Sequence, residues 1–237
     1  MMGIHTDPRF IIAFDFNAIE EADTLLQHLD PRLTRIKVGK AMFVKYGPNF
    51  VKYLQTKGFE VFLDLKFHDI PNTVYNACKE AAHLNVWMLN VHALGGRFML
   101  EQAVKAVQSH PNAKKPLLIG VTLLTSLHQD DLTFFNQEGD LNSLTLRLAG
   151  LCYEAGLQGV VCSAHEVPMI KQEFGKDFIC VTPGVRLDTQ EKQDQKRVAT
   201  PKEAFELGAD YIVIGRALTQ SNDPKTVLEK FFPLGAV

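Results

Sequence analysis

The sequence predicts an α/β fold, namely a single (β/α)8 barrel that spans residues 1–237. Two observations lead to this prediction: eight short apolar runs alternate with segments of helical periodicity, and no break in composition divides the chain. A length of 237 residues also suits one barrel of this kind, which takes roughly 200–250 residues. The strands should be apolar throughout, because both faces of a barrel strand are covered.

Each apolar run of strand length is expected to form one strand of the barrel. The runs are 10–14, 36–39, 60–65, 86–91, 116–121, 159–162, 178–181 and 211–214. Between them apolar residues recur at helical spacing, as at Ala22, Leu25 and Leu29. The predicted helices are 19–29, 50–56, 71–82, 96–109, 141–155, 167–174 and 224–231. An open, doubly wound sheet is the alternative, and it would require a glycine fingerprint after the first strand, where the chain has Asp15-Phe16-Asn17-Ala18.

Composition and charge exclude several classes of protein. The net charge of −2 leaves no basic excess, so neither nucleic acid nor an anionic membrane is expected as a partner. No apolar run approaches the ~20 residues of a membrane span, and the N-terminus does not resemble a signal peptide. The four cysteines are far apart and form no C-x-x-C pair, which favours buried thiols in a reducing cytoplasm over a disulfide framework or a zinc site.

Charged residues recur at one end of the predicted strands. Asp15 follows the first strand, Lys37 lies in the second, Asp64 and Lys66 end the third, and Arg216 follows the eighth. In (β/α)8 barrels the loops after the strand C-termini carry the catalytic groups. The sequence therefore predicts a site at this end of the barrel.

The stretch from Asp64 to Thr73 carries the densest group of such residues. On a strand, Asp64 and Lys66 point to the same face, and Asp69 and Thr73 follow in the exit loop and the next helix. Together with Lys37 these residues could form an alternating chain of charges, in which flanking carboxylates hold each lysine protonated. Such a lysine is a proton donor rather than a Schiff-base nucleophile. The alternative is an ion-pair network with a purely structural role.

The last two strands carry features of a phosphate site. Gly215-Arg216 is a glycine turn with a cation, and Arg186 follows the seventh strand. The long polar loop 187–199, which contains Gln195, is expected to be a lid, with an ordinary solvated loop as the alternative. The histidines at 68, 92 and 165 lack the spacing of metal ligands, so no metal is predicted.

The stretch Asp64-Leu65-Lys66-Phe67-His68-Asp69-Ile70-Pro71-Asn72-Thr73 resembles the active-site motif of the orotidine 5′-phosphate decarboxylase family, in its bacterial, single-function form. The resemblance extends over nearly the whole chain and implies a TIM barrel. It includes Phe14-Asp15, Lys37-Val38-Gly39, Asn90-Val91-His92-Ala93, Val121-Thr122-Leu123-Leu124-Thr125-Ser126, Val160-Val161-Cys162-Ser163, Val181-Thr182-Pro183-Gly184-Val185-Arg186, Asp194-Gln195 and Ile214-Gly215-Arg216.

The resemblance implies a carbon–carbon lyase that decarboxylates orotidine 5′-monophosphate to UMP in de novo pyrimidine biosynthesis, without metal or cofactor. Lys66 matches the general acid that protonates C6, Asp64 the carboxylate beside the departing group, Lys37 a ribose contact that braces Asp64, and Asp15 a ribose-hydroxyl partner. With Lys66, Asp64 and Lys37, Asp69 completes the implied catalytic set.

Further roles are implied for the binding of the substrate and for assembly. Asp69 and Thr73 match residues that reach into the neighbouring subunit's site, which implies a homodimer, and Thr125 and Ser126 match contacts to the pyrimidine. The phosphate side is implied to consist of Arg186, Gln195, Gly215 and Arg216.

Two alternatives to this activity remain open at the level of the sequence. One is a metal-dependent sugar-phosphate decarboxylase or aldolase-like synthase with a related D-x-K-x-x-D motif. The other is a catalytically inactive barrel that binds nucleotides. Loss of activity on dialysis against a chelator would indicate the first, and binding of UMP without turnover of orotidine 5′-monophosphate would indicate the second.

Overall fold

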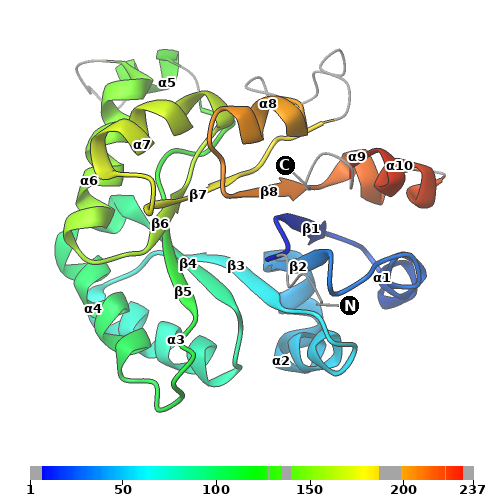
Figure 1. Cartoon of the computed structure of the whole chain (residues 1–237). Helices are drawn as coiled ribbons and strands as arrows, with labels where there is room; N and C mark the ends of the chain where they lie inside the picture. Colours follow the sequence, from blue (N-terminus) through cyan, green and yellow to red (C-terminus); the bar gives the residue numbers. More distant parts are fainter. Residues whose placement is uncertain (1–6, 128, 135–139, 187–198, 222, 232–237) are drawn as a thin grey trace.

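The computed structural model of the protein describes residues 7–127, 129–134, 140–186, 199–221 and 223–231. Eight parallel strands form a closed barrel at the centre (Figure 1), and the ring closes where β1 pairs with β8. The strands are β1 (Phe10–Phe14), β2 (Thr34–Gly39), β3 (Val61–Phe67), β4 (Met88–His92), β5 (Leu117–Val121), β6 (Gly159–Val161), β7 (Ile179–Thr182) and β8 (Tyr211–Ile214). The predicted (β/α)8 barrel is confirmed, and the open-sheet alternative is wrong.

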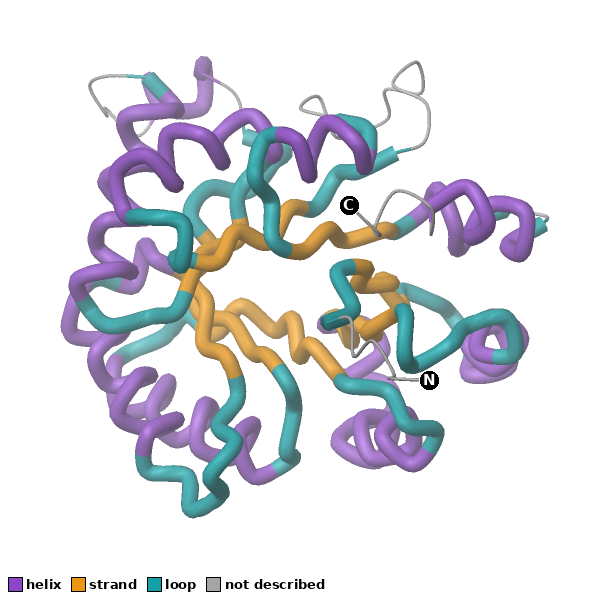
Figure 2. The backbone as a smooth tube through the Cα atoms, in the orientation of Figure 1, coloured by secondary structure: helices purple, strands orange, loops and turns teal. Residues whose placement is uncertain are grey.

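Helices surround the barrel on the outside, as the purple and orange tubes of Figure 2 show. They are α1 (Ile19–Leu26), α2 (Lys40–Thr56), α3 (Pro71–His83), α4 (Arg97–Gln108), α5 (Gln129–Phe134), α6 (Leu141–Glu154), α7 (Val167–Phe174), α8 (Pro201–Glu206), α9 (Arg216–Thr219) and α10 (Pro224–Phe231), with 3-10 turns η1 (Ala93–Gly95) and η2 (Ala164–Glu166). The apolar faces of the helices pack on the outward side chains of the strands in one continuous core. Both faces of the strands are therefore buried, which explains their unbroken apolar runs.

The interior of the barrel is filled by a second apolar cluster. It includes Ile11 of β1, Phe62 of β3, Met88 of β4, Ile119 of β5 and Val181 of β7. Large side chains from several strands thus close the barrel axis, so no pore runs through it. The space left for a ligand is at the C-terminal ends of the strands.

Several helices differ from the sequence-based expectation, since α2 starts earlier and the short helices α5, α8 and α9 are not among the predicted ones. Helix α2 begins at Lys40 rather than at residue 50, and it is kinked at Gly47, which has φ 63°, next to Pro48. Helix α8 is absent from the prediction, although a capping box marks its start: the Thr200 hydroxyl accepts from the Glu203 N–H, and the Glu203 carboxylate accepts from the Thr200 N–H.

A buried arginine lies at the N-terminal end of the barrel. The guanidinium of Arg35 lies 3.8 Å from the ring centroid of Trp87 and forms ion pairs with Asp7 at 2.5 Å and with Glu60 at 2.7 Å. The Tyr211 hydroxyl donates to Asp7 at 2.6 Å. Because every charge here has an opposite partner, β2 can begin two residues earlier than its apolar run indicates.

The cysteines are buried and free, as expected from their spacing: Cys78, Cys152, Cys162 and Cys180. Burial raises the pKa of the Cys78 and Cys152 thiols to about 12, so both stay protonated. Within the described parts of the chain, no helix has both the length and the apolar character needed to cross a membrane.

Candidate active site

The end of β3 departs from regular strand geometry. Leu63 pairs with Leu89 and Phe67 pairs with Val91, so the three residues 64–66 lie opposite the single residue Asn90 of β4. Lys66 has φ 51°, in the left-handed region that lysine rarely adopts. Asp64 and Lys66 do both face the barrel mouth, as expected, but a bulge brings them there instead of the simple alternation of a strand.

Four charged side chains from three strand ends form a continuous chain. The Lys37 ammonium lies 3.2 Å from Asp15 Oδ2 and 3.3 Å from Asp64 Oδ2, and the Lys66 ammonium lies 2.5 Å from Asp64 Oδ1. The Asp64 and Lys37 side chains are only 11% and 10% exposed, whereas that of Lys66 is 27% exposed. Lys37 and Asp64 are therefore the buried centre of this series of charges, and the Lys66 ammonium is accessible from the cavity.

Asp64 stays ionised despite its burial. Burial alone would raise the pKa of its carboxyl group, but the ammonium groups of Lys37 and Lys66 and hydrogen bonds from Lys66 and Asn90 outweigh it and hold the pKa below its ordinary value. Both carboxylate oxygens are engaged, because Oδ2 faces Lys37 while Oδ1 accepts from Lys66 and from Asn90 Nδ2 at 2.7 Å. This group is therefore a fixed negative charge at neutral pH.

The glycine that ends β2 allows this close approach. A Cβ atom on Gly39 would lie 2.5 Å from Asp15 Oδ1 and 3.2 Å from Lys37 Nζ, so any side chain there would displace the ion pair. The backbone of Gly39, with φ −87°, is open to any residue. The requirement for glycine at this position is thus steric and comes from the site itself.

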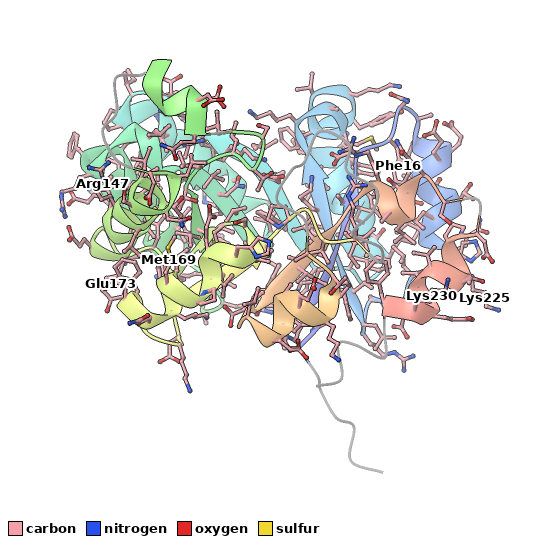
Figure 3. All side chains as sticks on the ribbon, turned by 90° about the horizontal axis from the view of Figure 1, so that it is seen from above. Phe16, Arg147, Met169, Glu173, Lys225 and Lys230 are labelled. Atoms are coloured by element: carbon pink, nitrogen blue, oxygen red, sulfur yellow. The ribbon has the colours of Figure 1, made fainter. Side chains whose placement is uncertain are left out.

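The chain of charges opens into a cavity of about 690 Å³ at the C-terminal ends of the strands. Apolar side chains form its floor, among them Phe62, Val121 and Val213, and Phe16, labelled in Figure 3, lines it as well. Of the residues singled out in the sequence, the structure brings to this cavity Asp15, Lys37, Asp64, Lys66, Thr125, Arg186, Gly215 and Arg216.

Three other candidate residues lie elsewhere, and a fourth is not among the residues that the structure describes. Asp69 and Thr73 are exposed beyond the end of β3, and Ser126 is exposed after β5, and none of these three lines the cavity. Gln195 and the predicted lid, apart from Ala199, lie outside the described residues. The roles of all these residues remain predictions.

Two arginines border the cavity on the side of β7 and β8. Arg186 follows β7 and is buried, with its N–H bonded to the Ala199 carbonyl at 3.0 Å. Arg216 begins α9 directly after Gly215. In the closed ring β7 lies across the barrel from β3, so Arg186 borders the cavity opposite Asp64 and Lys66, whereas Arg216 follows β8, which pairs with β1. An elongated ligand with an anionic end fits this distribution of charge.

Asn90 takes part in the site, although the sequence assigns it no role. Its side chain is completely buried in the middle of β4, where it contacts both Asp64 and the backbone of Lys66. The signal available in the sequence is an amide in an otherwise apolar strand, in the run Met88-Leu89-Asn90-Val91. A polar residue in such a strand requires a hydrogen-bond partner.

Two histidines stack beside the site. The rings of His68 and His92 have centroids 5.3 Å apart, and His92 Nδ1 accepts from the Leu94 N–H at 3.4 Å. Burial, followed by the nearby His68 and Lys66, lowers the pKa of His92 to about 4. The His92 ring is therefore neutral at physiological pH. Within the described ranges no three His, Cys, Asp or Glu side chains are grouped so as to hold a metal ion.

Comparisons with known proteins agree with this geometry. The model of the Orotidine 5'-phosphate decarboxylase / HUMPS family matches residues 8–231. An orotidine 5'-phosphate decarboxylase of Coxiella burnetii is 49% identical over 94% of each chain, and one of Tolumonas auensis is 50% identical over 95% of this chain and 97% of the relative. The crystal structure of orotidine 5'-phosphate decarboxylase from Lactobacillus acidophilus has a TM-score of 0.85 and 37% identity, and the match covers 98% of this chain and 100% of that one. The chain therefore belongs to the Orotidine 5'-phosphate decarboxylase / HUMPS family.

Proposed function

We propose that the protein is a lyase that decarboxylates orotidine 5′-monophosphate to UMP in pyrimidine biosynthesis, without metal or cofactor, as one catalytic domain over residues 1–237. The observation that carries this proposal is the series of charges Asp15, Lys37, Asp64 and Lys66 at the mouth of the barrel, in which Lys37 and Asp64 are buried. It holds one accessible ammonium beside one fixed carboxylate. The curated relatives carry the name of this activity.

Lys66 is assigned as the proton donor. Loss of carbon dioxide from C6 of the pyrimidine leaves an electron pair in the plane of the ring, where no neighbouring π system accepts it. A positioned ammonium stabilises that charge in a site of low dielectric and then transfers a proton to C6. The Lys66 side chain suits this role because Asp64 holds it at 2.5 Å while part of it stays open to the cavity.

Asp64 is assigned a place beside the carboxylate that leaves. Its carboxyl group stays ionised, since the two lysines hold its pKa below the ordinary value despite burial. A second carboxylate bound next to it is repelled, and this repulsion is relieved when carbon dioxide departs. The affinity needed to bind the substrate against that repulsion then comes from its remote groups.

The phosphate is assigned to the side of β7 and β8. Arg186 and Arg216 border the cavity there with Gly215, and guanidinium groups suit the geometry of a phosphate. Gln195 remains a predicted contact from the loop between Arg186 and Ala199. Asp15 and Lys37 would contact the ribose, and Thr125 and Ser126 the pyrimidine.

Independence from a metal is part of the proposal, and the contacts of Asp64 support it. A metal-dependent barrel with a related motif needs a carboxylate at this position that is available as a ligand. Here ammonium groups occupy both oxygens of Asp64, so a divalent cation would have to displace Lys37 or Lys66. Dialysis against EDTA should leave the rate unchanged, whereas loss of activity that Mg²⁺ restores would contradict the proposal.

A homodimer with shared sites is also proposed. Asp69 and Thr73 are exposed and do not line the cavity of their own chain. Large apolar side chains are exposed on the same part of the barrel: Ile70, which follows Asp69, is 68% exposed, and Phe98 of α4, the helix that packs on α3, is 63% exposed. An apolar surface of this kind next to a site indicates a protein contact. We propose that a second copy covers it and receives Asp69 and Thr73 into its own cavity.

The function is tested by mixing the protein with orotidine 5′-monophosphate and following the ultraviolet absorbance, with Lys66→Ala alongside. Wild type should consume the substrate, and the variant should lose almost all activity. If the variant stayed within about tenfold, or roughly 1.4 kcal/mol, Lys66 would not be the proton donor. Wild type that binds UMP but leaves the substrate unchanged would be an inactive nucleotide-binding barrel.

The shared site is tested by mixing two inactive variants, Lys66→Ala and Asp69→Ala. In a mixed dimer one site carries both substitutions and the other carries neither. Random exchange at equal concentrations should therefore restore about a quarter of the wild-type activity. The control pair is Lys66→Ala with Asp15→Ala, because both residues serve their own chain and every site stays defective. Failure of the first pair to recover, with exchange verified by mass spectrometry, would refute the sharing of Asp69.

Cytoplasmic location remains part of the proposal. The four buried free thiols suit a reducing compartment.

A further inference from the structure

The bulge in β3 leaves the backbone of Lys66 without a regular partner in the sheet. Three residues of β3 lie opposite the single residue Asn90, so the hydrogen-bond ladder between β3 and β4 is interrupted where the proposed acid is located. A buried N–H that lacks an acceptor is strongly unfavourable. Some other group must therefore bind the Lys66 N–H.

The side chain of Asn90 supplies that acceptor. Asn90 Oδ1 accepts from the Lys66 N–H at 2.7 Å, and Asn90 Nδ2 donates to Asp64 Oδ1 at 2.7 Å. The orientation of the amide follows from its partners, because the backbone N–H only donates and the carboxylate only accepts. The amide is completely buried, so water does not compete for either hydrogen bond.

The two hydrogen bonds of Asn90 have different effects: one supports the backbone of Lys66, and the other fixes the carboxylate of Asp64. The bond to the Lys66 N–H holds a backbone with φ 51°, a conformation that lysine rarely adopts without support. The bond to Asp64 fixes the oxygen that also contacts the Lys66 ammonium. One amide thus sets the position of the acid relative to the carboxylate beside it.

We propose that Asn90 is a positioning residue for the reaction, acting through Lys66 and Asp64 without touching the substrate. The inference rests on the proposed decarboxylase function. Asn90 does not line the cavity, so its effect should fall on turnover and not on the binding of the nucleotide. Leucine would fill similar space but leave the Lys66 N–H without its acceptor and Asp64 without one of its donors, and ionised aspartate would place a second negative charge against Asp64.

The experiment compares Asn90→Ala and Asn90→Asp with wild type and with Thr122→Val. Thr122 is a suitable control because it is equally buried at the end of the neighbouring strand, and its hydroxyl donates to the Val161 carbonyl at 3.0 Å, away from the charged chain. The readouts are kcat and KM for orotidine 5′-monophosphate, the Kd for UMP, and the melting temperature.

Asn90→Ala should lower kcat roughly 100-fold, the effect of misplacing a catalytic group by about 1 Å. The Kd for UMP should stay within about threefold, because the ribose and phosphate contacts are intact. Thr122→Val should change neither kcat nor the Kd by more than about threefold. A kcat of Asn90→Ala within about threefold of wild type, or a Kd for UMP that rises as much as kcat falls, would overturn the inference.

For Asn90→Asp the pH dependence of kcat distinguishes a positioning role from a merely structural one. When the introduced carboxyl group is protonated it reproduces both hydrogen bonds, since its O–H can donate to Asp64 while its carbonyl accepts from Lys66. When it is ionised it cannot donate, and it repels Asp64. The ratio of the variant's kcat to that of wild type should therefore fall as the pH rises from about 5 to about 8. A ratio that is constant over this range would contradict the proposal.

These outcomes separate the inference from the function on which it rests. Wild type that leaves orotidine 5′-monophosphate unchanged would refute the decarboxylase and the positioning role together. Active wild type with an unaffected Asn90→Ala variant would refute the positioning role alone.

Discussion

Replacing Asp64 by asparagine removes the charge at the centre of the chain while keeping the shape of the side chain. Asp64 is the shared partner of Lys37 and Lys66, at 3.3 and 2.5 Å, and its side chain is only 11% exposed. In Asp64→Asn the two ammonium groups lose their common counter-charge and repel each other. We therefore expect the folded protein to be less stable, even though asparagine fits the space.

The size of the expected loss of stability depends on the contacts that each lysine keeps in the variant. Breaking a buried ion pair by removing one partner costs roughly 3–5 kcal/mol. Lys37 keeps Asp15 at 3.2 Å, and Lys66 is partly open to water, so the lower end of that range applies. We expect a loss of about 3 kcal/mol in the free energy of unfolding at pH 7, or a fall in Tm of roughly 6–12 °C for a chain of this length.

The difference in stability between wild type and Asp64→Asn should become smaller at acidic pH. The folded-state pKa of Asp64 lies below its ordinary value of 3.8, so its stabilising contribution is complete above that value and is lost as the pH falls through the folded-state pKa. The deficit of Asp64→Asn should thus be constant from about pH 8 to about pH 5 and shrink below about pH 4, because Asp64 of the unfolded wild-type chain then binds a proton while Asp64 of the folded protein is still ionised.

Urea unfolding, followed by circular dichroism, measures the free energy of unfolding of both proteins at each pH. Asp177→Asn is the matched control, because Asp177 is exposed and has no ion pair with any residue that the structure describes. It should change stability by less than about 0.5 kcal/mol. If Asp64→Asn were as stable as wild type at pH 7, the carboxylate would not be balancing the two lysines, and the reasoning on its pKa would fail with it.

Two further substitutions test other parts of the molecule. Gly39→Ala places a Cβ 2.5 Å from Asp15 Oδ1, so the ion pair of Asp15 with Lys37 should separate and KM should rise about tenfold. The control is Gly150→Ala on α6, whose Cβ would meet only the Phe174 ring at 3.4 Å and should leave the kinetics unchanged. An unaltered KM for Gly39→Ala would show that the pair is not needed for binding. Arg35→Met removes the cation between Asp7 and Glu60 at the opposite end of the barrel, so the free energy of unfolding should fall by about 3 kcal/mol while kcat is preserved. A large loss of kcat in the enzyme that remains folded would show that this ion-pair cluster also affects the active site.

Most of the barrel is predictable because the strands are short apolar runs with polar residues at one end. The first strand, Phe10–Phe14, matches its apolar run, since nothing but apolar packing decides it. The second is expected to start at residue 36, and the structure begins it at Thr34 because two carboxylates and an aromatic ring allow Arg35 to be buried. Such compensation depends on residues distant in the sequence, which periodicity does not reveal.

The sequence is enough to predict which residues form the candidate site, but not the backbone conformation that brings them together. Position at the ends of the strands is enough to predict that Asp15, Lys37, Asp64 and Lys66 lie together. The bulge in β3 and the left-handed backbone of Lys66 are not predictable in this way, because a regular strand would also place Asp64 and Lys66 on one face. The missing information is the pairing with Asn90, a contact between strands.

The bulge also limits how far the motif can be moved to another protein. A designer who grafts the ten residues from Asp64 to Thr73 onto the third strand of a different barrel transfers the charges but not their arrangement. The conformation of Lys66 is completed by an amide 24 positions later in the chain, on a separate strand. The smallest transferable unit is therefore a pair of adjacent strands, and a search for related sites should look for the motif together with a buried amide facing it.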